Sequence, residues 1–241
     1  MRGLYTLLAQ ASLLSSTLGA NHAPQNAVKT KTLHTRDGYT YTYDYVPAHN
    51  ASMSTFLLLH GYPSSRSDWS HQVSALSSAG YGVIAPDLLG FGATSKPTDL
   101  EAYRLKAISG HLAEILDKEE VDKAVGVGHD WGSGVLSRLV VWYPERFSKL
   151  VFMSVGYAVP GELFDVDAIN AAGLEELDYT PFGYWYFFNS YDSAGIIAER
   201  VSIAFTFTLP WPYLGYLLIF SPSLFTLNLV IYPQTLKGIN S

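Results

Sequence analysis

Alternating hydrophobic and polar residues predict a β-hairpin near the N-terminal end of the chain. Residues 39–46 read YTYTYDYV, so four tyrosines would lie on one side of an extended strand. A period of two is typical of a strand with one face turned to the core. The Asp37-Gly38 pair favours a turn, and residues 29–35 can supply the partner strand. We therefore expect a hairpin over residues 29–46.

Three short apolar runs without alternation follow, at residues 55–59, 81–85 and 124–127. Such runs are typical of parallel strands that are buried on both faces of a sheet. Helical segments are expected between and after them, at residues 69–79, 101–118 and 132–143, and a further strand at residues 149–155. Because strand and helix alternate, the fold class is α/β, with a mostly parallel sheet flanked by helices over residues 28–158.

The pattern changes after this core. Residues 160–200 are helical in pattern and rich in aromatic side chains, and they contain no strand-like run. We interpret residues 159–200 as a partial helical cap inserted after the core.

Composition narrows the classes of function. Of the 241 residues, 48% are hydrophobic and 15% are charged, as in an ordinary globular protein. The chain has 15 Lys and Arg against 21 Asp and Glu, without a basic run, so we expect no nucleic-acid partner. The absence of cysteine excludes disulfides, thiolate metal sites and cysteine nucleophiles.

The two ends depart from this average. Residues 1–20 carry one charge, Arg2, then an apolar stretch and small residues near position 20, which is the layout of a secretory signal. We expect a secreted protein. The alternative is a frayed N-terminus of a cytoplasmic protein.

Residues 201–241 contain a single charged residue, Lys237, and their apolar stretch is interrupted by prolines. The prolines leave no clean membrane-spanning helix, so membrane association through this segment is not favoured. Val201-Ser202 can be encoded by GUAAGU, the consensus of an intron's 5′ end. We therefore hypothesise that this tail is a read-through or gene-model artefact.

An apolar strand, a glycine-rich turn and a helix mark the strongest candidate site. Residues 125–134 read VGVGHDWGSG, in which Gly128 and Gly132 stand two positions before and after Asp130, beside His129. A nucleophile held on a tight strand-to-helix turn needs small residues at these positions, because larger side chains would clash. The nearby helix N-terminus favours negative charge. The alternative is an ordinary helix N-cap aspartate.

A second motif, His60-Gly61-Tyr62-Pro63, follows directly on the expected strand at residues 55–59. An oxyanion-binding loop has this position, where a backbone N–H after the strand converges with the N–H of the residue following the nucleophile. Those donors would be the main-chain N–H groups of Tyr62 and Trp131. The alternative is a Gly-Pro turn that only links a strand to a helix. Two motifs in this order favour the catalytic interpretation.

Four segments match one known family in order and spacing: HGYPSSRSDW (60–69), PDLLGFG (86–92), GHDWG (128–132) and YPERF (143–147). With them the chain resembles α/β-hydrolases of the epoxide hydrolase family, of the type found in fungi, over about residues 28–200. The resemblance implies an α/β-hydrolase fold. It also implies a small hydrophobic epoxide as substrate, without a metal or organic cofactor.

The resemblance further implies roles for particular residues. In the family, the aspartate of GHDWG attacks an epoxide carbon to give an ester, and a histidine–carboxylate pair activates the water that releases a diol. Asp130 would be that nucleophile. Cap tyrosines of the family hydrogen-bond the epoxide oxygen, and Tyr184, in FGYW (182–185), stands at a position similar to the first of them. The alternative for Tyr184 is packing among neighbouring aromatic residues.

Part of the family pattern is missing. The acid and the histidine should follow the nucleophile, but the last histidine in the sequence is His129. Some relatives carry the acid at the end of the strand after the turn, where this chain has Ser154. We find no counterpart of the last two core strands in residues 201–241. The chain is therefore expected to be truncated after the start of the cap and impaired in turnover.

Two other functions stay open. Haloalkane dehalogenases share the aspartate and the tryptophan after it, but their oxyanion loop usually carries asparagine where this chain has Tyr62. A phenolic proton donor such as Tyr184 suits a carbon–oxygen leaving group better than a halide. The other alternative is a non-catalytic α/β-hydrolase fragment that binds a hydrophobic ligand.

Overall fold

The computed structural model describes residues 27–199. The expected signal segment at residues 1–20 and the apolar tail at residues 201–241 lie outside the described residues. Within the described part, six strands form one sheet in the order β1-β2-β4-β3-β5-β6. The strands are β1 (Lys29–His34), β2 (Thr40–Val46), β3 (Thr55–Leu59), β4 (Gly82–Pro86), β5 (Ala124–His129) and β6 (Phe147–Met153).

The sheet topology agrees with the sequence analysis. β1 pairs antiparallel with β2, as expected of the hairpin, and β2 pairs antiparallel with β4. The remaining pairings, β3 with β4, β3 with β5 and β5 with β6, are all parallel. The prediction of an α/β fold with a mostly parallel sheet is thus confirmed.

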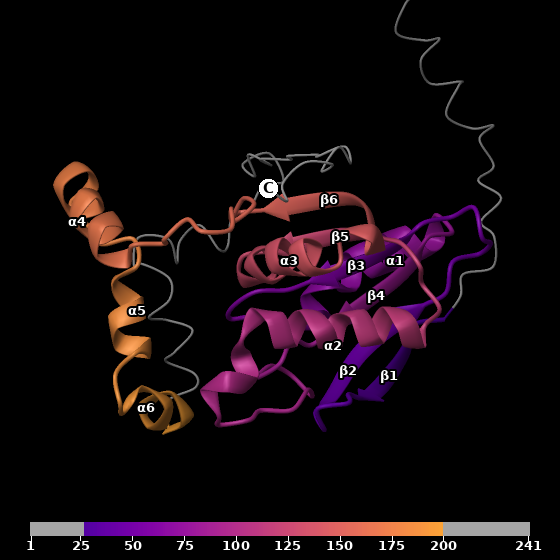
Figure 1. Cartoon of the computed structure of the whole chain (residues 1–241), viewed down its shortest axis with the longest axis horizontal. Coiled ribbons are helices and arrows are strands. Elements are labelled where there is room, and N and C mark those ends of the chain that lie inside the picture. Colours follow the sequence, from indigo (N-terminus) through magenta and orange to yellow (C-terminus); the bar gives the residue numbers. More distant parts are fainter. Residues whose placement is uncertain (1–26, 200–241) are drawn as a thin grey trace, which may run out of the picture.

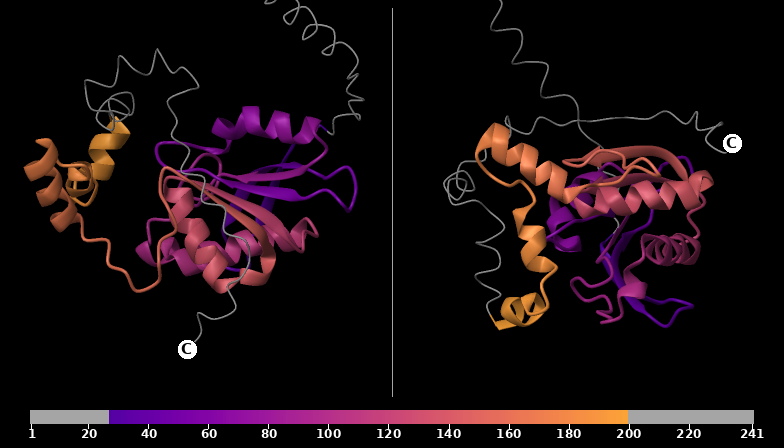
Figure 2. Two further views of the ribbon diagram at one scale, coloured as in Figure 1. Left: turned by 90° about the horizontal axis from the view of Figure 1, so that it is seen from above. Right: turned by 60° about the vertical axis from the view of Figure 1, so that its left-hand side comes forward.

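Helices cover both faces of this sheet. The core helices are α1 (Ser70–Ser78), α2 (Leu105–Lys118) and α3 (Trp131–Trp142), with short 3-10 turns at Arg66–Trp69, Leu100–Tyr103 and Pro144–Arg146. α2 and α3 lie side by side on one face, and α1 lies on the opposite face (Figures 1 and 2). This arrangement buries the central strands on both sides.

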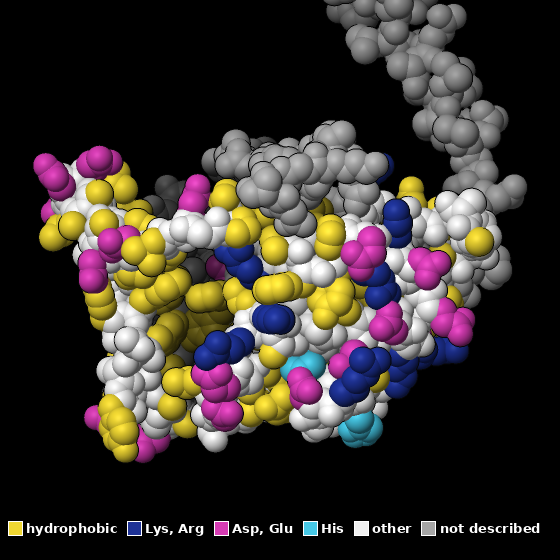
Figure 3. Space-filling view, in the orientation of Figure 1, with side chains coloured by type: hydrophobic (Ala, Val, Ile, Leu, Met, Phe, Trp, Pro, Cys, Tyr) yellow, Lys and Arg dark blue, Asp and Glu magenta, His cyan; other side chains and the backbone are white. Residues whose placement is uncertain are grey.

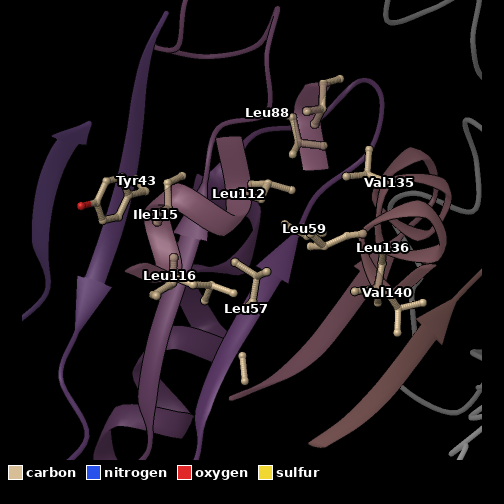
Figure 4. Packing of buried hydrophobic residues seen from close by; sticks show 14 of the residues in the cluster. Tyr43, Leu57, Leu59, Leu88, Leu112, Ile115, Leu116, Val135, Leu136 and Val140 are labelled. Carbon is tan, nitrogen blue, oxygen red and sulfur yellow. The ribbon is translucent and has the colours of Figure 1, made fainter. Parts of the chain in front are cut away.

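Alternate side chains of the central strands fill two hydrophobic layers. Leu57 and Leu59 of β3 pack with Leu112 of α2 and Val135 of α3, as the close view in Figure 4 shows. Leu58, between them, belongs to the layer on the α1 side. A strand that supplies both layers has no polar face, which explains why β3 appears in the sequence as an unbroken apolar run.

The structure corrects several boundaries. The strand expected at residues 149–155 is β6 and begins two residues earlier, because Phe147 pairs with Ala124 and is 1% exposed. It ends at Met153, since Ser154 adopts a left-handed φ of 65°. The expected helix at residues 101–118 is broken at Arg104, where the backbone is extended between a 3-10 turn and α2.

The cap consists of helices, as the sequence predicts. Its described helices are α4 (Val166–Leu177), α5 (Gly183–Phe188) and α6 (Ser193–Glu199). They form a column beside the core, which an extended segment after β6 connects to it (Figures 1 and 2). Within residues 27–199, no helix has the length and apolar character needed to cross a membrane.

Candidate active site

Asp130 lies on a sharp turn between β5 and α3. Its backbone has φ 53° and ψ −122°, a conformation that non-glycine residues rarely adopt and that is typical of strained functional positions. Asp130 occupies the N-cap position of α3, but its side chain makes no capping hydrogen bond. The alternative interpretation as an ordinary N-cap aspartate is therefore wrong, and the carboxylate is available for another role.

Gly128 and Gly132, which flank Asp130, lie where a larger side chain would clash with the backbone. A Cβ on Gly132 would lie 2.2 Å from the carbonyl oxygen of Leu59 at the end of β3. A Cβ on Gly128 would lie 2.6 Å from the carbonyl oxygen of Gly132. Both distances are shorter than any real contact, so the turn can form only when both positions are glycine. The steric argument from the sequence thus holds for this turn.

Backbone hydrogen bonds fix the turn against the neighbouring strand. The Asp130 N–H donates to the Met153 carbonyl at 3.2 Å, and the Ser133 N–H donates to the Asp130 carbonyl at 2.9 Å. The buried hydroxyl of Ser133 donates to the Gly128 carbonyl at 2.9 Å. We did not predict this role of Ser133, although a small polar residue between the two glycines that follow Trp131 is a usable signal.

The loop after β3 reaches the Asp130 carboxylate. The main-chain N–H of Tyr62 donates to Asp130 Oδ1 at 2.9 Å. Gly61 permits this approach, because a Cβ there would lie 2.4 Å from the same oxygen. The exposed Pro63 continues the loop. The other expected donor belongs to Trp131, the first residue of α3, whose side chain is 45% exposed.

His60 is a structural link between two loops. Its ring is buried, with Nδ1 2.8 Å from the Gly61 carbonyl and Nε2 accepting the Leu88 N–H at 3.0 Å. These partners assign a neutral ring that carries its proton on Nδ1. Burial lowers the pKa of His60, which favours the same neutral form. Both ring nitrogens are hydrogen-bonded, so His60 holds the loop after β3 and is not a free base.

A buried ion pair joins the same two loops. Asp87, after β4, is fully buried and pairs with the guanidinium of Arg66. Its carboxylate also accepts the main-chain N–H groups of Arg66 and Ala93, at 2.9 and 2.8 Å. Arg66 Nε reaches Asp44 of β2 at 3.3 Å. The sequence does not indicate this pair, because only the folded sheet brings residues 66 and 87 together.

The cap contacts the residues that adjoin Asp130. The indole of Trp185 stacks on that of Trp131, with ring centroids 5.3 Å apart and planes at 19°. The ring of Phe188 meets that of Tyr62 edge to face at 5.2 Å. Tyr184 packs against Phe188 at 5.6 Å, so it lies one ring away from Tyr62. The structure thus brings the expected cap residue close to the expected oxyanion loop.

The surface between the cap and the core is hollowed. Figure 3 shows hydrophobic side chains lining this hollow. In the part of the chain that the structure describes, no group of three or more His, Asp or Glu side chains is placed to hold a metal ion.

A family model described as alpha/beta hydrolase fold matches residues 54–186, which include the turn at Asp130 and the loop after β3. The chain belongs to this family. The matched range also includes α4 of the cap and ends within α5.

Curated relatives of this α/β-hydrolase include proteins named epoxide hydrolases. Epoxide hydrolase B of Mycobacterium tuberculosis is 41% identical over 105 residues, which are 44% of this chain and 30% of that protein. Epoxide hydrolase 3 of Siraitia grosvenorii is 40% identical over 115 residues, 46% of this chain and 36% of the relative. The chain therefore spans only about a third of the length of these curated relatives.

Solved structures of epoxide hydrolases also match this chain. A crystal structure of an epoxide hydrolase from Vigna radiata matches with a TM-score of 0.62 and 25% identity, over 75% of this chain and 56% of that one. Epoxide hydrolase A from Mycobacterium thermoresistibile matches with a TM-score of 0.54 and 31% identity, over 61% and 45%. The predicted family resemblance and fold are confirmed by these matches.

The histidines of this α/β-hydrolase offer few candidates for a base. His111 is buried, with one nitrogen 3.2 Å from the Tyr41 hydroxyl and the other 3.2 Å from Asp37. His129 is the last residue of β5, directly before Asp130, and is half-buried. Ser154, which stands where some relatives carry the acid, is exposed after β6. Among residues 27–199, the histidine–carboxylate contact is that of His111 with Asp37, which joins α2 to the turn between β1 and β2.

Proposed function

We propose that this α/β-hydrolase carries an epoxide hydrolase-like site in which Asp130 is the nucleophile. The observation that carries the proposal is the Asp130 carboxylate, presented on a strained turn without a capping bond and contacted by the Tyr62 N–H. The names of the relatives give the substrate class, an epoxide.

The first step forms an ester. An Asp130 carboxylate oxygen attacks one epoxide carbon, and the electron pair of the breaking carbon–oxygen bond passes to the epoxide oxygen. The phenol of Tyr184 gives its proton to that oxygen, so the product is a hydroxyalkyl ester and a tyrosinate. The Tyr62 N–H holds the other carboxylate oxygen in place during the attack.

The second step hydrolyses the ester. Water adds to the ester carbonyl, and the Tyr62 and Trp131 N–H groups stabilise the oxyanion that forms there. A base must take a proton from the attacking water. The 241 residues contain no histidine after His129. We therefore propose that the 241-residue chain completes the first step and stalls before the second.

Intact-protein mass spectrometry after incubation with phenyloxirane tests this proposal. We expect the wild-type chain to gain the mass of one epoxide and the Asp130→Asn variant to gain none. The absence of cysteine removes the most reactive competing side chain. Equal labelling of the two proteins contradicts Asp130 as nucleophile. Faster labelling by a chloroalkane of similar size would instead favour the haloalkane dehalogenase alternative.

A further inference from the structure

Two pairs of aromatic rings connect the cap to the core beside Asp130. Trp185 stacks on Trp131, and Phe188 meets Tyr62 edge to face. Trp185 and Phe188 are three positions apart on α5 and so lie on one side of the helix. Their core partners are the residue after Asp130 and the residue whose N–H binds the Asp130 carboxylate. The cap therefore reaches the core at both residues that adjoin the candidate nucleophile.

The two pairs stand apart from each other. Among residues 27–199, no ring of the Trp131–Trp185 pair contacts a ring of the Tyr62–Phe188 pair. The hollow between cap and core is lined by hydrophobic side chains (Figure 3). The four rings carry no charge. We call these two ring pairs the aromatic walls. They lie at the residue after Asp130 and at the residue whose N–H binds its carboxylate.

Trp185 has further aromatic neighbours in the cap. Its indole also contacts the ring of Phe164 at 5.3 Å and that of Phe182 at 5.7 Å. These contacts fix the orientation of the indole before any ligand binds. A rigid aromatic surface loses little conformational freedom when it orders a ligand.

Aromatic walls distinguish an aromatic from a saturated substituent on the ligand, in addition to distinguishing ligands by volume. An aromatic substituent gains an electrostatic contribution from edge-to-face or offset packing on the walls, about 0.5–1.5 kcal/mol beyond its burial. That range corresponds to an affinity ratio of roughly two to about tenfold. A saturated ring of the same carbon skeleton buries similar apolar area but lacks this contribution.

We propose that Trp185 is a specificity-determining residue that selects epoxides carrying an aryl substituent. The inference rests on the proposed function, because it takes Asp130 as the point at which the epoxide binds. It adds to that function the kind of substituent, an aryl group, that the epoxide carries. Trp185 acts by packing against the aryl group and takes no part in bond making.

The test compares two ligands with one carbon skeleton, phenyloxirane and cyclohexyloxirane. Equilibrium binding is measured by calorimetry with the Asp130→Asn chain, which forms no ester, so the result does not depend on whether Asp130 reacts. We expect this protein to bind phenyloxirane several-fold more tightly. Adding Trp185→Leu should weaken phenyloxirane binding by that same several-fold factor, so that the preference is lost, and change cyclohexyloxirane binding by less than about twofold.

Two further variants serve as controls. Trp185→Phe keeps an aromatic wall and should keep the preference, which maintains the test if Trp185→Leu fails to fold. Tyr191→Leu changes a fully exposed tyrosine of the cap and should leave both affinities unchanged. Equal affinity of the parent for both ligands, binding of neither, or equal loss for both after Trp185→Phe and Trp185→Leu overturns the inference. Labelling of the wild-type chain by phenyloxirane tests the proposed function separately.

Discussion

At the scale of single residues, the site depends on a few positions where only one side chain fits. Asp130 adopts a left-handed φ because the strand must turn into α3 within one residue. That turn is possible only with glycine at 128 and 132. The sequence indicates these positions because the constraint is local and steric. It did not indicate the protonation state of His60, which depends on a partner 28 positions away.

Gly132→Ala should disrupt the turn between β5 and α3 that carries Asp130. Its Cβ would lie 2.2 Å from the Leu59 carbonyl oxygen, and forced overpacking costs about 1–3 kcal/mol or more. We expect a lower midpoint of urea unfolding and loss of phenyloxirane labelling. The matched control is Gly134→Ala on the same helix, where an added Cβ meets nothing within 4 Å. That variant should gain up to about 1 kcal/mol. Similar behaviour of the two variants would refute the steric argument.

Stability should fall in mild acid because of His60. Its pKa is lowered in the folded protein, chiefly by burial, so the unfolded chain binds the proton more readily. The stabilising contribution is complete above the ordinary pKa of 6.5 and is lost as the pH falls below it. The slope is at most about 1.4 kcal/mol per pH unit.

Urea unfolding of the wild-type chain and of His60→Leu, from about pH 8 to about pH 5, measures this contribution. The variant should lack the part of the slope due to His60. His71→Ala, at an exposed position of α1, is the control and should keep it. An unchanged slope in His60→Leu would show that the ring does not stay neutral in the fold.

At the scale of elements, the apolar runs predicted the strands well and their ends less well. β3 was predicted at both ends because polar residues flank a run buried on both faces. β6 was displaced by two residues, since Phe147 had been assigned to the preceding motif and its burial depends on the distant Ala124. The link of Arg66 to Asp87 was missed for the same reason. Long-range pairings decide these features, and one sequence does not display them.

Asp87→Ala should loosen the loops that carry the site. It leaves two main-chain N–H groups without their acceptor and leaves the Arg66 guanidinium with Asp44 alone as a carboxylate partner. A buried donor that loses its acceptor costs about 1–3 kcal/mol. Chemical denaturation should show a loss of this size, with weaker phenyloxirane labelling even where the chain remains folded. Asp122→Ala, at an exposed position before β5, should stay within about 0.5 kcal/mol of wild type. Equal stability of the two variants would argue against the pair as a support of the site.

At the scale of the whole molecule, the described residues form a core and part of a cap that together bring Asp130, Tyr62 and Tyr184 into one region. Under the proposed function, these are the groups that attack on an epoxide requires. Among residues 27–199, the histidine–carboxylate contact is that of His111 with Asp37, which joins α2 to the turn between β1 and β2. The two chemical steps are therefore separable in this polypeptide. This separation leads to a prediction about turnover.

The 241-residue chain should form its ester and then stop. Loss of general-base catalysis typically slows the step that it serves by about 10²–10⁴-fold. Rapid-quench chromatography of the chain with excess phenyloxirane should therefore detect less than one diol per chain beyond the spontaneous background. The Asp130→Asn chain supplies that background. Steady release of many diols per chain would mean that a base outside the expected histidine position completes the reaction.

The central claim is that Asp130 forms the bond to the substrate, and tandem mass spectrometry tests it most directly. The chain is incubated with phenyloxirane, quenched in acid, digested and sequenced through residues 124–142. We predict that the added mass lies on Asp130, as an ester that hydroxylamine removes. An adduct on His129 or another side chain, or no adduct in a folded protein, would contradict the account.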